Sequence, residues 1–163
     1  TKIDVISEVA KVCYTLEEYE EAWFYYEKLI SIRYALKLDI YHNYDLNMAF
    51  VLEQLGREQE AKSFYESYLA FAEKDQSIYQ ELTMAAYFAA KGDIEKGMNG
   101  LKAFSKQDNY QYWFVLFLDK DPILLKMKNH PDFQNTVQKI RTKFWENHKE
   151  IKKMLVDKDI VRM

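Results

Sequence analysis

Apolar side chains recur along the first hundred residues with the period of an α-helix. In the segment 3–14 they fall at Ile6, Val9, Ala10 and Cys13, which is the i, i+3, i+4, i+7 spacing of an amphipathic helix. No segment alternates apolar and polar residues as a half-buried strand does, and no glycine-rich phosphate loop is present. The chain is therefore expected to be all-α. Similar spacing predicts further helices over 15–38, 44–55, 58–74, 77–92 and 93–106.

Glycine marks two of the expected helix ends. Gly56 and Gly92 each follow an apolar-periodic segment, where a left-handed residue commonly ends a helix. The chain holds only four glycines and two prolines, so long loops are not expected. Two pairs fit the capping box of a helix start: Thr15 with Glu18, and Ser77 with Gln80.

A small residue recurs near the start of every second predicted helix, at Ala22, Ala61 and Gly97. The spacing is about 40 residues, within the range of stacked helical repeats. A small side chain at such a position lets two helices approach closely. The pattern predicts three helix pairs stacked in series, an architecture whose product is a surface that holds another molecule.

With these positions the segment 3–106 resembles the tetratricopeptide repeat family. Small residues also match in the middle of each first helix, at Ala10, Ala49 and Ala85, and an aromatic residue matches late in the second helix at Tyr26 and Tyr65. The resemblance implies an α-solenoid, a right-handed superhelix of helix-turn-helix pairs. The family's usual proline after the second helix is absent. The expected organisation is residues 1–108 as three pairs, at about 3–38, 43–74 and 77–106, followed by a C-terminal helical cap, 109–163.

The C-terminal third has a different pattern. After an aromatic helix over 109–118, the dipeptide Asp121-Pro122 marks a helix start, and His130-Pro131-Asp132 marks another. This order resembles a terminal segment that follows such repeats in bacterial proteins. One long amphipathic helix should then cover the open end of the stack. Its apolar stripe is expected at Phe133, Val137, Ile140, Phe144, His148, Ile151 and Leu155.

Residues that carry catalytic or metal chemistry do not gather in the sequence. The three histidines are far apart and none pairs with a cysteine or a carboxylate at metal-ligand spacing, so no metal site is expected. Cys13 lies on an apolar stripe, where its thiol would be buried and unreactive. The chain is therefore expected not to be an enzyme and to need no cofactor.

Charge and hydropathy narrow the choice of partner. Acidic side chains outnumber basic ones over 1–100, and the reverse holds over 101–163, but Glu146 and Glu150 interrupt the lysines of the last helix. Nucleic acid is therefore a disfavoured partner. The longest apolar run, 112–118, is far shorter than the roughly 20 residues that span a bilayer, so no membrane insertion and a cytoplasmic location are expected.

The expected function is that of a scaffold or adaptor that binds a peptide or a partner helix in a concave groove. By the register that the resemblance implies, the groove is lined by Lys11, Tyr14, Asn43, Leu46, Asn47, Phe50, Tyr79, Leu82, Thr83 and Ala86. The mix of asparagine and aromatic side chains favours an apolar or aromatic segment over a C-terminal carboxylate. Three alternatives remain: an accessory domain of a larger enzyme or transcriptional regulator, self-association into a homodimer, and a groove covered by the chain's own C-terminal segment.

Overall fold

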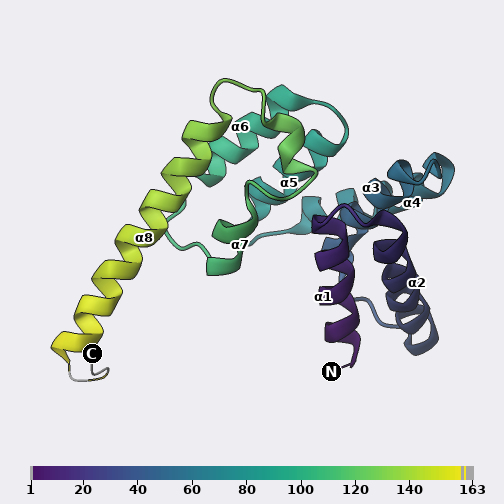
Figure 1. Cartoon of the computed structure of the whole chain (residues 1–163), viewed down its shortest axis with the longest axis horizontal. Coiled ribbons are helices and arrows are strands. Elements are labelled where there is room, and N and C mark those ends of the chain that lie inside the picture. Colours follow the sequence, from purple (N-terminus) through teal and green to yellow (C-terminus); the bar gives the residue numbers. More distant parts are fainter. Residues whose placement is uncertain (1, 159, 161–163) are drawn as a thin grey trace.

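The computed structural model describes residues 2–158 and 160, and within them every regular element is helical (Figure 1). The prediction of an all-α protein is confirmed. The elements are α1 (Lys2–Thr15), α2 (Tyr19–Leu36), the 3-10 turn η1 (His42–Tyr44), α3 (Asp45–Gln54), α4 (Glu58–Lys74), α5 (Gln80–Ala90), α6 (Ile94–Phe104), α7 (Tyr112–Phe117), the 3-10 turn η2 (Leu124–Met127) and α8 (Phe133–Asp157).

The first six α-helices pack as consecutive hairpins, α1 with α2, α3 with α4 and α5 with α6, and each hairpin also contacts the next. Small residues lie where the paired helices touch. Ala22 and Ala61 are buried, and a Cβ added to Gly97 would come within 3.2 Å of the carbonyl oxygen of Ala85. At Gly97 the prediction of a small residue between paired helices is confirmed, because an added Cβ would also lie 3.3 Å from the backbone nitrogen of Ala89 in α5. At this contact there is no room for a larger side chain without a shift of the neighbouring atoms.

Glycine ends two of these helices as expected. Gly56 and Gly92 have φ angles of 71° and 81°, in the left-handed region that costs glycine nothing. The two expected capping boxes do not form. Thr15 donates its hydroxyl back to the carbonyl oxygen of Lys11, and the oxygen of Ser77 accepts the backbone N–H of Tyr79, which lies before α5 begins. Local hydrogen bonds of this kind compete with capping for the same side chains.

The C-terminal segment turns back across the hairpins. Asp121 accepts the backbone N–H groups of Ile123 and Leu124 and so starts a helical turn, as the sequence predicts. This turn does not continue into a longer helix, and only the short 3-10 turn η2 follows it. The Lys126 ammonium donates to the carbonyl oxygen of Ala90 and fastens η2 to the end of α5.

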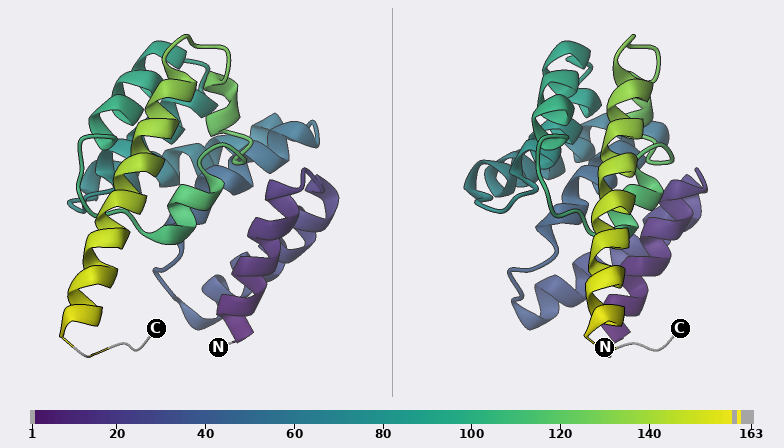
Figure 2. Two further views of the ribbon diagram at one scale, coloured as in Figure 1. Left: turned by 60° about the vertical axis from the view of Figure 1, so that its left-hand side comes forward. Right: turned by 90° about the vertical axis from the view of Figure 1, so that its left-hand side faces the viewer.

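Helix α8 begins at Phe133 and contacts α6 and α7. Phe133, Val137 and Ile140 are buried, whereas Ile151 and Met154 are about half exposed. The last turns extend beyond the rest of the molecule (Figure 2). The expectation that the whole apolar stripe of this helix covers the stack is therefore wrong for the residues beyond Phe144. The periodicity of the stripe shows only that one face is apolar, and the body of the protein ends before the helix does.

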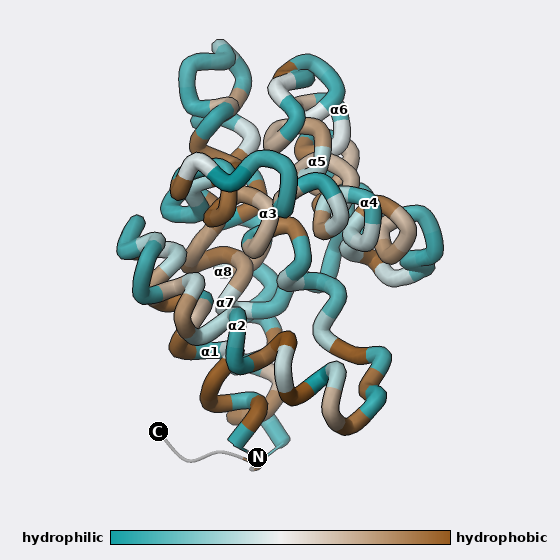
Figure 3. The backbone as a smooth tube through the Cα atoms, turned by 90° about the vertical axis from the view of Figure 1, so that its right-hand side faces the viewer, coloured by the Kyte–Doolittle hydropathy of each residue, from teal (hydrophilic) through white to brown (hydrophobic). Residues whose placement is uncertain are grey.

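The core runs through all three hairpins and the C-terminal segment. Its largest fully buried side chains include Tyr14, Tyr26, Phe104 and Phe133. Hydrophilic and hydrophobic residues alternate along most of the chain (Figure 3). Helix α3 lies deepest in the core, because seven of its ten residues are buried. None of the described helices combines the length and the apolar character that crossing a bilayer requires.

Candidate functional site

A cavity of about 400 Å³ lies between the hairpins and the C-terminal segment. One wall is formed by residues of α1, η1, α3, α4 and α5, and the opposite wall by the segment from Gln111 to Leu124. The volume is within the range of pockets that hold a small ligand or a few side chains. Aromatic rings dominate the lining, and they are Tyr14, Tyr44, Tyr68, Phe71, Tyr79, Trp113, Phe114 and Phe117.

The structure brings the residues expected on the concave face to this cavity, with one exception. Phe50 does not line it. Its side chain is 5% exposed, and its ring packs edge to face against Tyr14 and Tyr19 with centroid distances of 6.0 Å. Phe50 therefore belongs to the core beneath the cavity. The residues that do line the cavity are Lys11, Tyr14, Asn43, Leu46, Asn47, Tyr79, Leu82, Thr83 and Ala86.

The C-terminal segment covers part of the surface that these residues form. The ring of Phe114 stacks on Tyr79 with a centroid distance of 4.4 Å, and the backbone N–H of Gln111 donates to the Tyr79 hydroxyl at 3.0 Å. The Lys11 ammonium lies 4.1 Å from the centroid of the Trp113 ring, in a cation–π contact. The groove is thus neither fully open nor filled, because the segment leaves the cavity beneath it.

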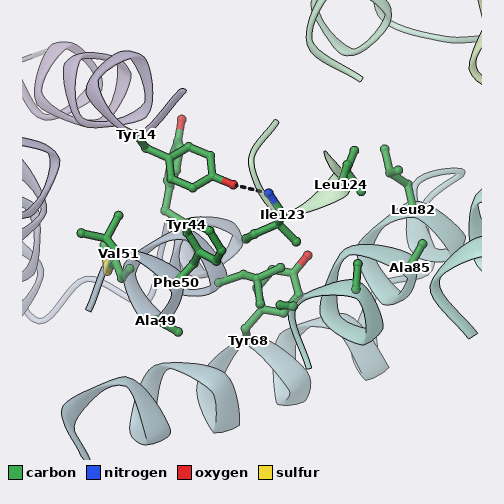
Figure 4. Packing of buried hydrophobic residues seen from close by; sticks show 14 of the residues in the cluster. Tyr14, Tyr44, Ala49, Phe50, Val51, Tyr68, Leu82, Ala85, Ile123 and Leu124 are labelled. Atoms are coloured by element: carbon green, nitrogen blue, oxygen red, sulfur yellow. Dashed lines mark hydrogen bonds between the residues drawn. The ribbon is translucent and has the colours of Figure 1, made fainter. Parts of the chain in front are cut away.

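Tyr14 joins the two walls. Its hydroxyl donates to Asp121 Oδ1 at 3.0 Å. The same hydroxyl accepts the backbone N–H of Ile123 at 3.3 Å (Figure 4). Burial, followed by the nearby Asp121 carboxylate, raises the pKa of Tyr14 well above its usual value. Burial also raises the pKa of Asp121, although the hydrogen bonds from Leu124, Tyr14 and Ile123 oppose the shift. The tyrosine therefore stays protonated and acts as a fixed hydrogen-bond donor.

One buried polar group beside the cavity is not satisfied. The Tyr26 hydroxyl is fully buried and has no hydrogen-bond partner within residues 2–158 and 160. Its surroundings include Tyr44, Asn47 and Asp121, all of which line the cavity. A buried hydroxyl without a partner is costly, and in proteins such groups are commonly satisfied by water or by a ligand. Tyr26 does not itself line the cavity, whereas the neighbouring Asn47 does, so of these two side chains the Asn47 amide is the one at the cavity surface.

A second polar cluster, which the sequence analysis missed, joins α2, α3 and α4. The buried carboxylate of Asp45 accepts from Arg33 at 2.7 Å and from Ser67 at 2.6 Å, and lies 2.8 Å from the His42 ring. The other ring nitrogen of His42 is 2.7 Å from Asp39. The expectation stated for the histidines concerned metal-ligand spacing, whereas His42 contacts Asp39 and Asp45 by hydrogen bonds within this cluster. The sequence does contain one sign of these contacts, because Asp39, His42 and Asp45 follow one another at i, i+3 spacing.

This cluster satisfies a buried charge rather than forming an open site, because the donors around Asp45 come from three packed helices. Within the described residues, no group of three or more His, Cys, Asp or Glu side chains is arranged to hold a metal ion. Cys13 is buried, as the sequence predicts. Burial, together with Glu18 and Glu21, raises the pKa of its thiol, which keeps it in the unreactive protonated form.

Comparison of the chain with family models, with curated proteins and with solved structures found no match.

Proposed function

We propose that this protein is a non-catalytic adaptor, built as a tetratricopeptide-like solenoid, that binds a short segment of a partner protein in the cavity beneath its C-terminal segment. The observation that carries the proposal is the aromatic cavity of about 400 Å³ and its position on the inner face of the hairpins. The consecutive hairpins and the small residues at their contacts support the solenoid assignment.

The lining favours an apolar or aromatic anchor. The rings of Tyr68, Phe71 and Phe117 provide contact area, and a peptide side chain that enters the cavity gains from leaving water. The charged groups of the lining already have partners, since Asp121 accepts from Tyr14 and Lys11 contacts Trp113. A highly charged segment would find few unpaired groups to bind it.

The partly buried amide of Asn47, which lines the cavity, supports a ligand that also carries a hydrogen-bonding group. A peptide backbone supplies such a group at every residue. A peptide with one large apolar side chain next to a free backbone amide would satisfy both sides of the cavity.

Filling the cavity tests this function without weakening the core. Ala86 lines the cavity and is only partly buried, so Ala86→Phe should occupy the space while the protein stays folded. The probe is a displayed library of random short peptides. We expect enriched sequences to share an aromatic or aliphatic anchor, and we expect Ala86→Phe to reduce their affinity at least about tenfold, which corresponds to about 1.4 kcal/mol.

The matched control is Ala70→Phe, which adds the same ring to the exposed surface of α4 and should leave binding unchanged. Fluorescence polarisation with a labelled selected peptide measures both variants. A library that yields no enriched peptide, or a peptide that binds Ala86→Phe as tightly as the wild type, contradicts the proposed function.

A further inference from the structure

The charged residues that line the cavity carry an excess of negative charge. The residues of the lining that are charged in their ordinary form at neutral pH are Lys11, Asp75 and Asp121. The Lys11 ammonium already has an anionic neighbour outside the lining, because Glu8 lies 3.9 Å away. Neither Asp75 nor Asp121 forms an ion pair in the part of the chain that the structure describes. The lining therefore contains carboxylates that lack a cationic partner.

Asp121 keeps one oxygen of its carboxylate without a hydrogen bond. Its hydrogen bonds come from neutral donors, the Tyr14 hydroxyl and the backbone N–H groups of Ile123 and Leu124, and all of them end on Oδ1. Oδ2 accepts none within residues 2–158 and 160, where it is not one of the fully buried atoms. Burial raises the pKa of this carboxyl, and the hydrogen bonds and the Lys11 ammonium oppose the shift only in part. A cation beside Oδ2 would stabilise the ionised carboxylate and offset the cost of its burial.

Aromatic rings of the lining lie close to this carboxylate. Tyr14 from α1 and Tyr68 from α4 both point toward the segment at Ile123, which follows Asp121 closely in the chain (Figure 4). Burial, followed by the Asp121 charge, raises the pKa of Tyr68 well above its usual value, so the two side chains interact electrostatically. The face of an aromatic ring carries partial negative charge and attracts a cation. The rings and Asp121 therefore favour the same kind of ligand.

The lining already holds one ammonium group against its rings. The Lys11 ammonium lies 4.1 Å from the centroid of the Trp113 ring and 5.6 Å from that of Phe117. It forms no ion pair with Asp121, so it does not replace a cation at that carboxylate. Rings in this cavity can thus contact a cation at the distances of a cation–π interaction.

The hydrogen bonds of the lining favour a cation that needs few acceptors. The other tyrosine hydroxyls of the lining are already bonded within the protein: Tyr44 donates to Glu8, Tyr68 donates to the carbonyl oxygen of Thr83, and Tyr79 accepts the backbone N–H of Gln111. Both oxygens of Asp75 also accept hydrogen bonds. A primary ammonium or a guanidinium group carries several N–H donors, for which few acceptors remain. A trimethylammonium group has no N–H and is recognised by aromatic faces.

We propose that the cavity binds a trimethylammonium group, and that the partner segment supplies this group as a trimethylated lysine side chain. This role rests on the proposed function and specifies its anchor. The alkyl stem of the lysine is the apolar part, and the methylated ammonium lies against the rings and next to Asp121 Oδ2.

Other anchors fit the charge of the lining less well. A neutral side chain would fill the same volume but would leave Asp121 without a counter-charge. An acidic side chain would be repelled by Asp75 and Asp121, which also line the cavity. A segment with several cations would carry more positive charge than the lining can compensate, since Lys11 already offsets one of the carboxylates.

A peptide library that binds to the whole chain tests this assignment. Each displayed peptide carries trimethyllysine at its centre between random residues, and the most enriched peptide is then resynthesised in other forms. One form has unmodified lysine, and another has the neutral isostere in which a carbon atom replaces the charged nitrogen. Fluorescence polarisation measures the affinity of each form. We expect trimethyllysine to bind more tightly than unmodified lysine, and at least about tenfold more tightly than the isostere, which differs from it only in charge.

A change of Asp121 tests the carboxylate. Asp121→Asn keeps an oxygen that accepts from Tyr14 and from the backbone but removes the negative charge. It should weaken binding of the trimethyllysine peptide at least about threefold and leave binding of the isostere unchanged. The matched control, Asp157→Asn, removes an exposed carboxylate at the end of α8 and should change neither affinity. Circular dichroism shows whether both variants keep the helical fold.

The outcomes separate this assignment from the proposed function. An isostere that binds the wild type as tightly as the trimethyllysine peptide would overturn the assignment and leave the proposed function intact, because that function requires only an apolar anchor. Equal losses of both peptides in Asp121→Asn would also overturn it, since Asp121 would then act through the fold. Free choline that binds as tightly as the peptide would show that the trimethylammonium group comes from a small molecule, and the lysine source would be wrong. If neither this library nor the unmodified one yields a peptide, the proposed function fails as well.

Discussion

The two halves of α8 carry the same kind of amphipathic pattern but lie in different surroundings. Ile140 of the first half is fully buried against the rest of the protein, whereas Ile151, on the same side of the helix three turns later, is half exposed. The ion pairs of α8 are also found in its first half only, within the described residues. Arg141 and Lys143 form ion pairs with Asp119 and Asp108, and the lysines beyond Asn147 form none within the described residues. A periodic apolar stripe therefore shows that a helix has a packing face without showing what packs on it.

The largest expected effect on the free energy of unfolding comes from the same isoleucine-to-alanine change made once in each half of α8. Ile140→Ala removes a fully buried side chain and leaves a cavity, so it should lower the free energy of unfolding by about 2–5 kcal/mol. Ile151→Ala should change it by less than about 0.5 kcal/mol when the protein is monomeric, since the side chain already contacts water. Urea unfolding at a low protein concentration measures both.

Wild-type protein at the same concentration is the reference for these two variants. Equal losses for Ile140→Ala and Ile151→Ala would mean that the second half of α8, residues 145–157 (the projecting half), packs against the body of the same molecule in solution. That result would remove the difference between the halves.

Removing a charged side chain from each half of α8 should change the free energy of unfolding by a smaller amount. Arg141 binds Asp119 with two hydrogen bonds of 2.9 and 2.5 Å, and both side chains are partly buried. Arg141→Ala should therefore lower the free energy of unfolding by about 1 kcal/mol. Lys153→Ala removes an exposed cation without a partner and serves as the control in the projecting half.

The measurement is urea unfolding at low and at high salt. Because ions screen exposed charges more than buried ones, the loss caused by Arg141→Ala should persist when salt is raised. A variant as stable as the wild type would show that apolar packing alone holds the first half of α8 in place.

The helices could be predicted from the sequence because their signals are local. The bounds of α4 follow from the apolar spacing between Glu58 and Lys74, and Gly56 and Gly92 mark helix ends through the backbone angles that only glycine adopts easily. Nine of the 23 residues that line the cavity followed from the register of Ala10, Ala49 and Ala85 along their helices, and all nine lie on the wall that the hairpins form.

The other wall of the cavity could not be predicted in this way. It depends on the contact between Tyr14 and Asp121, which are 107 residues apart in the chain. The pattern around Asp121-Pro122 predicts a helical turn, but nothing local indicates which surface that turn will contact. The burial of Asp45 among Arg33, His42 and Ser67 has the same cause, because three separate helices provide its surroundings.

The smallest predicted effect concerns the charge of Asp121 in the packed part of the C-terminal segment. Burial raises the pKa of this carboxyl above its usual value of about 3.9. A folded-state pKa above the unfolded value means that protonation favours the folded protein. Asp121 therefore contributes stability below the unfolded pKa, and this contribution is lost as pH rises through the folded pKa.

Asp121→Asn keeps an oxygen that can accept from Tyr14 and from the backbone of Ile123, but it removes the charge. We expect the melting temperature of the variant to rise relative to that of the wild type as pH increases from about 4 to about 7. Asp157→Asn, which removes a carboxylate from the projecting half, controls for the loss of one negative charge. If the difference between Asp121→Asn and wild type stayed constant over this range, the hydrogen bonds from Tyr14 and the backbone would outweigh burial. The walls of the cavity would then be joined through an ionised Asp121 carboxylate that accepts from the neutral Tyr14, rather than through a carboxyl group that burial pushes toward its neutral form.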